Sequence, residues 1–104
     1  LIKKDYSVYS RRILELFFKD LLATTGKFNK IGSYWEKNNT NEIDIIAVNE
    51  NKKKLMIVEV KLKSSNINLN VLKDRASKLL LSYPDYQIKW KGLSLETVRD
   101  FVGF

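Results

Sequence analysis

Three charged residues stand in two short segments that otherwise have the composition of buried strands. Asp44 lies within EIDIIAV (42–48), and Glu59 and Lys61 lie within LMIVEVKL (55–62). Two carboxylates and an ammonium group brought close together could bind a divalent cation and an anion, because hard cations prefer oxygen ligands. The 104 residues include no cysteine and no histidine, so disulfides, Cys/His zinc sites and catalysis by Cys or His are excluded.

The pairing of these two strands decides whether the carboxylates meet. If the turn at 49–54 places Val48 opposite Leu55, alternation along the strands puts Asp44 directly opposite Glu59. A turn of this length also allows pairings shifted by two residues. Two carboxylates about 4 Å apart repel by on the order of 4 kcal/mol at an effective dielectric constant of about 20. Protonation of one carboxylate, a bridging lysine or a bound cation would relieve this repulsion.

The same pairing places Glu42 opposite Lys61 and concentrates the charges at the open end of the hairpin. The other face of the hairpin carries only apolar side chains: Ile43, Ile45, Ala47, Met56, Val58, Val60 and Leu62. We therefore expect a central hairpin with one wholly buried face. Lys61 would balance the charge of Glu59 or contact a bound anion, and Glu42 would pair with Lys61 or face solvent.

The rest of the sequence predicts the elements that hold this hairpin in place. The expected helices cover 7–23, 69–82 and 95–101, and the expected strands cover 29–36, 42–48, 55–62 and 86–90. Short connections favour an antiparallel meander for the first three strands, and the helix before the fourth favours a crossover. Gly92 is expected to turn the chain, and Ser94 to cap the last helix. The order α-β-β-β-α-β-α predicts the α/β class, with a mixed sheet flanked by helices.

Length and charge limit the kinds of function. Residues 1–104 fit one domain. The sequence contains neither a run of 18 apolar residues nor a signal-peptide pattern, so we expect no membrane association and a cytoplasmic location. The first residue is Leu1, and we expect the chain to be part of a longer protein. The net charge of +7 attracts polyanions such as nucleic acid, although solubility alone also accounts for it.

Magnesium-assisted hydrolysis of a phosphodiester bond is the chemistry that fits these residues. Asp44 and Glu59 would hold Mg²⁺, which lowers the pKa of a bound water, and Lys61 would stabilise charge on the phosphate. Glu15, at the edge of the apolar stripe of the first helix, would complete the site if that helix packs on this end of the sheet. The alternatives are a solvated helix glutamate and a salt-bridged surface patch without a ligand.

Other side chains have two interpretations each. Lys73, Arg75 and Lys78 on the second helix would either contact backbone phosphates or form a solvated face. Three aromatic residues would either stack on bases or, as we favour, pack in the core: Trp35, Tyr86 and Trp90.

Asp44 together with EVK at 59–61 resembles the PD-(D/E)XK nuclease superfamily, and the order α-β-β-β-α-β matches its restriction-endonuclease-like core. On this resemblance, Asp44 is the first acid of the motif and 59–61 is its (D/E)XK element. Glu15 matches the acid that many members carry on the first helix. Ile43 stands where the motif has proline, which is a common departure.

The stretches GSYWEKNNTNEIDIIAVNE and IVEVKLK are more closely similar to the nuclease-like C-terminal domain of archaeal and bacterial AAA+-type ATPases, over roughly residues 6–82. The resemblance implies DNA as substrate, Mg²⁺ or Mn²⁺ held by Asp44, Glu59 and Glu15, and Lys61 at the scissile phosphate. It also implies an N-terminal ATPase region of the same chain as partner. Two alternatives stay open: a catalytically silent nuclease-fold module that binds DNA or protein for the ATPase, and a sheet used to form a homodimer.

Overall fold

The computed structural model describes residues 3–38 and 41–102, with side chains for 11–38 and 41–98. Its elements are α1 (Lys3–Thr24), β1 (Lys30–Trp35), β2 (Glu42–Asn49), β3 (Lys54–Lys61), the 3₁₀ turn η1 (Ser64–Asn66), α2 (Leu69–Arg75), the 3₁₀ turn η2 (Leu79–Ser82), β4 (Gln87–Ser94) and α3 (Leu95–Val102). The predicted order and the α/β class are confirmed. The predicted turn at 37–41 includes residues 39 and 40, which lie outside the described residues.

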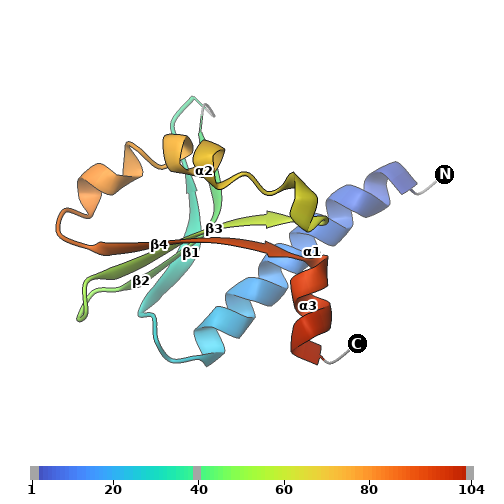
Figure 1. The fold of residues 1–104 in the computed structure, drawn as a ribbon, viewed down its shortest axis with the longest axis horizontal. Helices are drawn as coiled ribbons and strands as arrows, with labels where there is room; N and C mark the ends of the chain where they lie inside the picture. Colours follow the sequence, from blue (N-terminus) through green and yellow to red (C-terminus); the bar gives the residue numbers. More distant parts are fainter. Residues whose placement is uncertain (1–2, 39–40, 103–104) are drawn as a thin grey trace.

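The four strands form one mixed sheet in the order β1-β2-β3-β4. The pairs β1/β2 and β2/β3 are antiparallel, whereas β4 runs parallel to β3 after the connection through α2. The predicted meander and crossover are therefore confirmed. Figure 1 shows α1 crossing one side of the sheet, while α2 and the 3₁₀ turns lie on the other. In the described part of the chain, no helix is long and apolar enough to cross a membrane.

β2 and β3 pair in one of the registers that the sequence left open, but over a shorter length than expected. Val48 lies opposite Leu55, and the ladder continues to the pair Ile45–Val58. The ladder ends there, so the expected direct opposition of the charged residues is wrong. The two expected pairs that this ladder lacks are Asp44–Glu59 and Glu42–Lys61.

A β-bulge in β2 explains why the strand face changes at this end. Gly32 pairs with Ile46 and Tyr34 pairs with Ile43, so β2 has one more residue than β1 between these two pairs. Ile43 therefore packs in the cluster on the α2 side of the sheet, whereas Ile45 packs on the α1 side. The expectation that Ile43 and Ile45 share one wholly apolar face is wrong, because the bulge breaks the alternation of the strand.

The α1 side of the sheet holds the first half of the core. Leu14 and Phe18 of α1 pack with four strand residues: Ile45, Val58, Val60 and Leu93. Phe18 is completely buried, but Ile13 and Phe17 of the predicted apolar stripe are 46% and 36% exposed. Only one edge of that stripe therefore covers the sheet.

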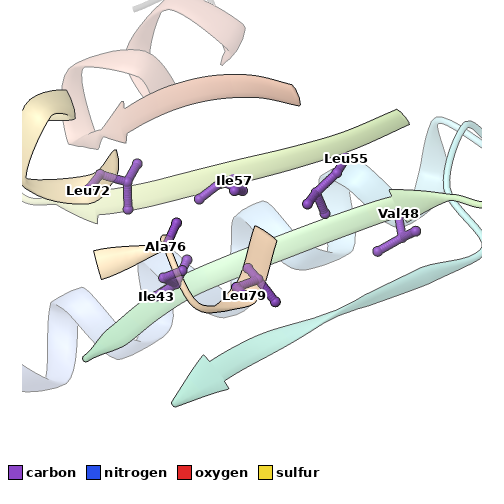
Figure 2. Close-up of a cluster of buried hydrophobic side chains, with 7 residues drawn as sticks. All are labelled: Ile43, Val48, Leu55, Ile57, Leu72, Ala76 and Leu79. Carbon is purple, nitrogen blue, oxygen red and sulfur yellow. The ribbon is translucent and has the colours of Figure 1, made fainter. Parts of the chain in front are cut away.

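The α2 side holds the second half of the core. Figure 2 shows Leu72, Ala76 and Leu79 facing apolar side chains of β2 and β3: Ile43, Val48, Leu55 and Ile57. The predicted single helix over 69–82 is instead the short helix α2, a turn and η2. At the end of α2, the Ala76 N–H is shared between the carbonyls of Leu72 and Lys73, and Ala76 has ψ −4°. This tightening interrupts the helix.

Gly92 continues β4 instead of ending it, so the predicted turn is wrong. It lies beside Glu59 in the parallel ladder. A Cβ atom built at position 92 would lie 2.5 Å from Cγ2 and 2.9 Å from Cδ1 of Ile67. The strand therefore needs glycine because Ile67 packs directly onto its backbone.

Gly92→Ala is expected to lower the free energy of unfolding by about 1–3 kcal/mol, because Ile67 is β-branched and cannot easily move aside. Gly32→Ala is the matched control, since a Cβ there meets nothing within 4 Å. That variant should gain up to about 1 kcal/mol, as expected for glycine replaced within a strand. Urea unfolding followed by circular dichroism compares the two. Equal stabilities would contradict the contact with Ile67.

Candidate metal and phosphate site at the end of the central strands

Asp44 lies where β2 and β3 stop pairing. Its Oδ2 atom accepts a hydrogen bond of 2.8 Å from the backbone N–H of Val60. Its own carbonyl accepts a hydrogen bond of 2.9 Å from the Ser33 hydroxyl on β1. The bulge thus lets the carboxylate enter the opening between the strands and supply an acceptor where the ladder has ended. Among the described residues, no hydrogen bond reaches Asp44 Oδ1.

Glu59 is a buried charged residue on β3. Its side chain lies on the α2 side of the sheet, and the residue is only 5% exposed. Oε2 accepts a hydrogen bond of 3.2 Å from the N–H of Asn68, the residue that caps α2. Oε1 lies 3.9 Å from both Lys61 Nζ and Arg75 Nη1. A buried carboxylate needs such partners, because an uncompensated charge in the interior is costly.

Lys61 stands between this carboxylate and solvent. Its side chain is 31% exposed, so the ammonium group is free to contact an anion while it stays near Glu59. Arg75 adds a second cation on the same oxygen. On sequence grounds Arg75 was a candidate for phosphate contacts or a solvated face. Its position three residues after the buried Leu72, beside the apolar stripe of α2, is the signal that places it against the sheet.

Glu15 approaches the site from the other side of the sheet. It belongs to α1, its side chain is 22% exposed, and its Oε2 lies 4.0 Å from Arg11 Nε. Burial raises the pKa of the Glu15 carboxyl above its ordinary value, and the nearby charge of Asp44 raises it further. Glu15 is thus electrostatically linked to Asp44. Among the side chains of 11–38 and 41–98, however, no three acidic, His or Cys groups gather closely enough to hold one metal ion.

Glu15→Gln is expected to raise the melting temperature at pH 7 and to leave it unchanged below the ordinary carboxyl pKa of 4.5. The pKa of Glu15 is higher in the folded state than in the unfolded state. At pH values between these two pKa values, the folded state therefore binds more protons than the unfolded state. Stability therefore falls as the pH rises through this window. Thermal unfolding with a chelator present, from pH 4 to pH 8, is the measurement. A constant difference across this range would contradict the assignment.

A shallow hollow of about 190 Å³ opens beside Asp44, lined by residues that include Arg11, Arg12, Glu15, Trp35 and Glu42. Trp35 is 66% exposed and belongs to neither core cluster, so the expectation that it packs in the core is wrong. It lies on β1, which is an edge strand. Tyr86 and Trp90 pack against the cluster on the α2 side, as expected. Lys73 Nζ lies 5.8 Å from the centre of the Trp90 ring.

The donor atoms near the opening suit a hard divalent cation. Asp44 Oδ1 has no hydrogen bond in the described part of the chain, and Glu59 Oε1 has only two cations at a distance too long for hydrogen bonds. Mg²⁺ and Mn²⁺ take oxygen ligands, and Mg²⁺ usually binds one or two carboxylates and keeps several waters. Asp44 and Glu59 therefore carry oxygen atoms of the type that such an ion takes.

The fold and this site define an α/β domain with acidic residues and a lysine at the end of the two central strands of a mixed sheet. The chain belongs to the DUF234 family, described as "Archaea bacterial proteins of unknown function", whose profile matches residues 1–79. That match includes all four predicted site residues.

A comparison with curated proteins gives a longer relative. The chain is 37% identical over 107 residues to an uncharacterized protein of Methanocaldococcus jannaschii. The alignment covers 96% of this chain and 22% of the relative, so the chain spans about a fifth of that protein. No solved structure matches the chain.

Proposed function

We propose that this chain is a divalent-metal-dependent, endonuclease-like domain that hydrolyses phosphodiester bonds of DNA. The observation that carries the proposal is the buried Glu59 carboxylate beside the strand opening that Asp44 enters. Its cations, Lys61 and Arg75, stay 3.9 Å away, so their charge is near while the oxygen is left for another ligand. The resemblance of Asp44 and 59–61 to the PD-(D/E)XK motif supports the same chemistry.

Each side chain has a defined role in this proposal. Asp44 and Glu59 hold Mg²⁺ or Mn²⁺, and Glu15 on the α1 side supports the ion through its charge, which is electrostatically linked to that of Asp44. When bound, the ion lowers the pKa of a coordinated water and offsets negative charge on the phosphate. Lys61 donates to a phosphate oxygen and stabilises the charge that develops there. Arg75 balances Glu59 and fixes its orientation, which makes it a positioning residue.

The surface around the site supports a polyanionic substrate. The net charge is +7, and Arg11 and Arg12 line the hollow beside Asp44. Lys73 and Lys78 are exposed on the α2 side and would contact backbone phosphates. The exposed Trp35 ring offers a surface on which an unpaired base can stack. DNA binding that weakens as salt rises follows from these charges.

The length of the relative supports a partner within the same polypeptide. Since the alignment covers only 22% of the M. jannaschii protein, we propose that domains of this kind serve a larger chain. The similarity to the C-terminal domain of AAA+-type ATPases makes an N-terminal ATPase region the proposed partner. A cytoplasmic location is proposed with it.

The second candidate is a catalytically silent module of the same fold that binds DNA or protein for that ATPase. A specific observation favours it: Asp44 and Glu59 both accept backbone hydrogen bonds, and Glu59 also lies near two cations. Within the described ranges, moreover, no three-carboxylate cluster is formed. Both carboxylates would then stabilise the end of the sheet instead of holding a metal ion.

Cleavage of supercoiled plasmid DNA separates the two candidates. The wild-type chain is expected to nick the plasmid with Mg²⁺ or Mn²⁺ and not with a chelator. Lys61→Met should lower the rate by about a hundredfold, as loss of a donor to the developing charge does in other enzymes. Lys63→Met, two residues beyond and exposed, is the matched control and should cleave normally. Salt-dependent DNA binding without metal-dependent cleavage would favour the silent module.

A further inference from the structure

A second hollow lies at the opposite end of the sheet from Glu59. It has a volume of about 730 Å³, within the range of small-molecule sites. Its walls come from three parts of the chain: the segment after α1, the turn between β2 and β3 with the beginning of β3, and the beginning of β4. The first of these segments and the β2–β3 turn lie on the same side of Figure 1 as the start of β4. Lys54 is five residues from Glu59 along β3, about 17 Å at the rise of a strand.

Positive charge dominates this hollow. Four lysines line it: Lys27, Lys52, Lys54 and Lys89. No acidic residue is among its lining residues, and none of the four lysines has an ion pair within the described part of the chain. The contrast is Lys30 nearby, which lies 3.1 Å from Glu50. The uncompensated charge calls for a ligand with several negative charges, such as phosphate groups.

The floor of the hollow is apolar. Phe28 and Met56 contribute apolar side chains to it, and Gln87 adds an amide at the rim. Leu55 and Ile88 also line the hollow, but their side chains pack in the cluster on the α2 side of the sheet. An inorganic anion would leave this apolar surface exposed to water. A ligand with a planar ring as well as phosphates would cover it, and the Gln87 amide can both donate to and accept from the edge of a base.

The walls are fixed before any ligand arrives. Asn49 joins two of them: its Nδ2 donates to the Lys27 carbonyl at 2.7 Å, and its Oδ1 accepts from the Lys52 N–H at 3.0 Å. The Gln87 N–H donates to the Lys53 carbonyl at 2.8 Å and ties β4 to the same turn. A site whose walls are already ordered loses less entropy when it binds.

We propose that this hollow binds a nucleotide, with the phosphates among the four lysines and the base on the apolar floor. The nucleotide is either free or one unit of a single strand that leaves the hollow through its open side. The proposal is independent of phosphodiester hydrolysis, because it uses no residue of the Asp44–Glu59 site. It gives the basic charge of the domain a specific location.

Isothermal titration calorimetry of the wild-type chain with ATP, AMP, sodium triphosphate and an oligo(dT) single strand tests the proposal. ATP is expected to bind more tightly than both triphosphate and AMP. Lys54→Gln combined with Lys89→Gln should weaken ATP binding more than tenfold, as expected when two charged contacts are lost. Lys37→Gln combined with Lys63→Gln removes the same charge at the other end of the sheet and should bind as wild type does. Backbone NMR shifts on adding ATP should centre on Met56 and Ile88.

The outcomes separate the sources of the ligand. Tight binding of oligo(dT) that the first double variant weakens would support a nucleotide unit within a strand. Equal binding of triphosphate and ATP would overturn the proposal, because the base would then contribute nothing. Equal ATP affinity in the two double variants would also overturn it. So would the result that none of the four probes binds. Melting temperatures of both double variants show that they are folded.

Discussion

Glu59→Gln is expected to lower the rate of metal-dependent DNA cleavage by at least about a hundredfold, since even loss of an outer partner of a metal ligand often costs about that factor. The substitution keeps the size of the side chain and removes the charge that would hold the ion. It also leaves Lys61 and Arg75 without the carboxylate that lies 3.9 Å from each. Plasmid nicking at several Mn²⁺ concentrations is the measurement.

Two comparisons make this result interpretable. Glu50→Gln makes the same chemical change on an exposed turn at the other end of the sheet and should cleave as wild type does. Because Glu59 is buried among cations, Glu59→Gln also lowers stability, so its melting temperature sets a working temperature at which the variant is fully folded. Wild-type cleavage by folded Glu59→Gln protein would show that the carboxylate has no catalytic role.

Phe18→Ala is expected to lower the free energy of unfolding by about 3–5 kcal/mol. Phe18 is completely buried and packs against strand residues that include Ile45 and Val58. Because domains of this size are stable by only about 5–15 kcal/mol, this loss brings the protein close to unfolding. The Ile45–Val58 pair is the last of the β2–β3 ladder, so the opening that Asp44 enters should loosen as well.

Phe17→Ala provides the control for this prediction. Phe17 is the adjacent residue on α1, has the same side chain and contacts Phe18 edge-on with 5.5 Å between ring centres. It is 36% exposed, whereas Phe18 is completely buried, so its loss should cost well under half as much. Guanidinium unfolding of both variants gives the comparison. Similar losses would mean that α1 does not dock on the sheet through the Phe18 edge.

Much of the fold follows from patterns that depend only on neighbouring residues. Alternation along 55–62 and the short turn at 49–54 predicted an antiparallel hairpin, which is confirmed, and left open several registers, among which the structure has the one that pairs Val48 with Leu55. The helix between the third and fourth strands predicted the crossover, because a parallel pair needs a long connection. The hairpin and the crossover follow from short stretches of sequence, whereas the exact register of the hairpin does not.

The details of the candidate site depend on contacts that are distant in the chain. The bulge in β2 arises from pairing with Gly32 and Tyr34 of the edge strand, and it redirects Ile43 and ends the ladder before Asp44. Gly92 looks like a turn residue until Ile67 is seen to pack on it. In the register that pairs Val48 with Leu55, strand alternation would place the two carboxylates directly opposite each other. The structure has this register, but Asp44 lies in the strand opening and Glu59 is buried on the α2 side.

The hydrophobic stripe of α1 shows a similar limit. The spacing of Ile13, Leu14, Phe17 and Phe18 correctly predicts an amphipathic helix. It does not predict which edge of the stripe faces the sheet, because the docking angle of the helix depends on the strands beneath it. In the structure, the docking angle buries Leu14 and Phe18 and leaves Ile13 and Phe17 exposed.

The central claim is that Asp44 and Glu59 hold one divalent cation at the end of the central strands. A crystal structure of the chain grown with Mn²⁺, with data collected at the manganese absorption edge, tests it most directly. The account predicts an anomalous peak in contact with both carboxylates in the wild type, and none at that position in Glu59→Gln crystals. Crystals saturated with Mn²⁺ that show no peak between Asp44 and Glu59 would contradict it.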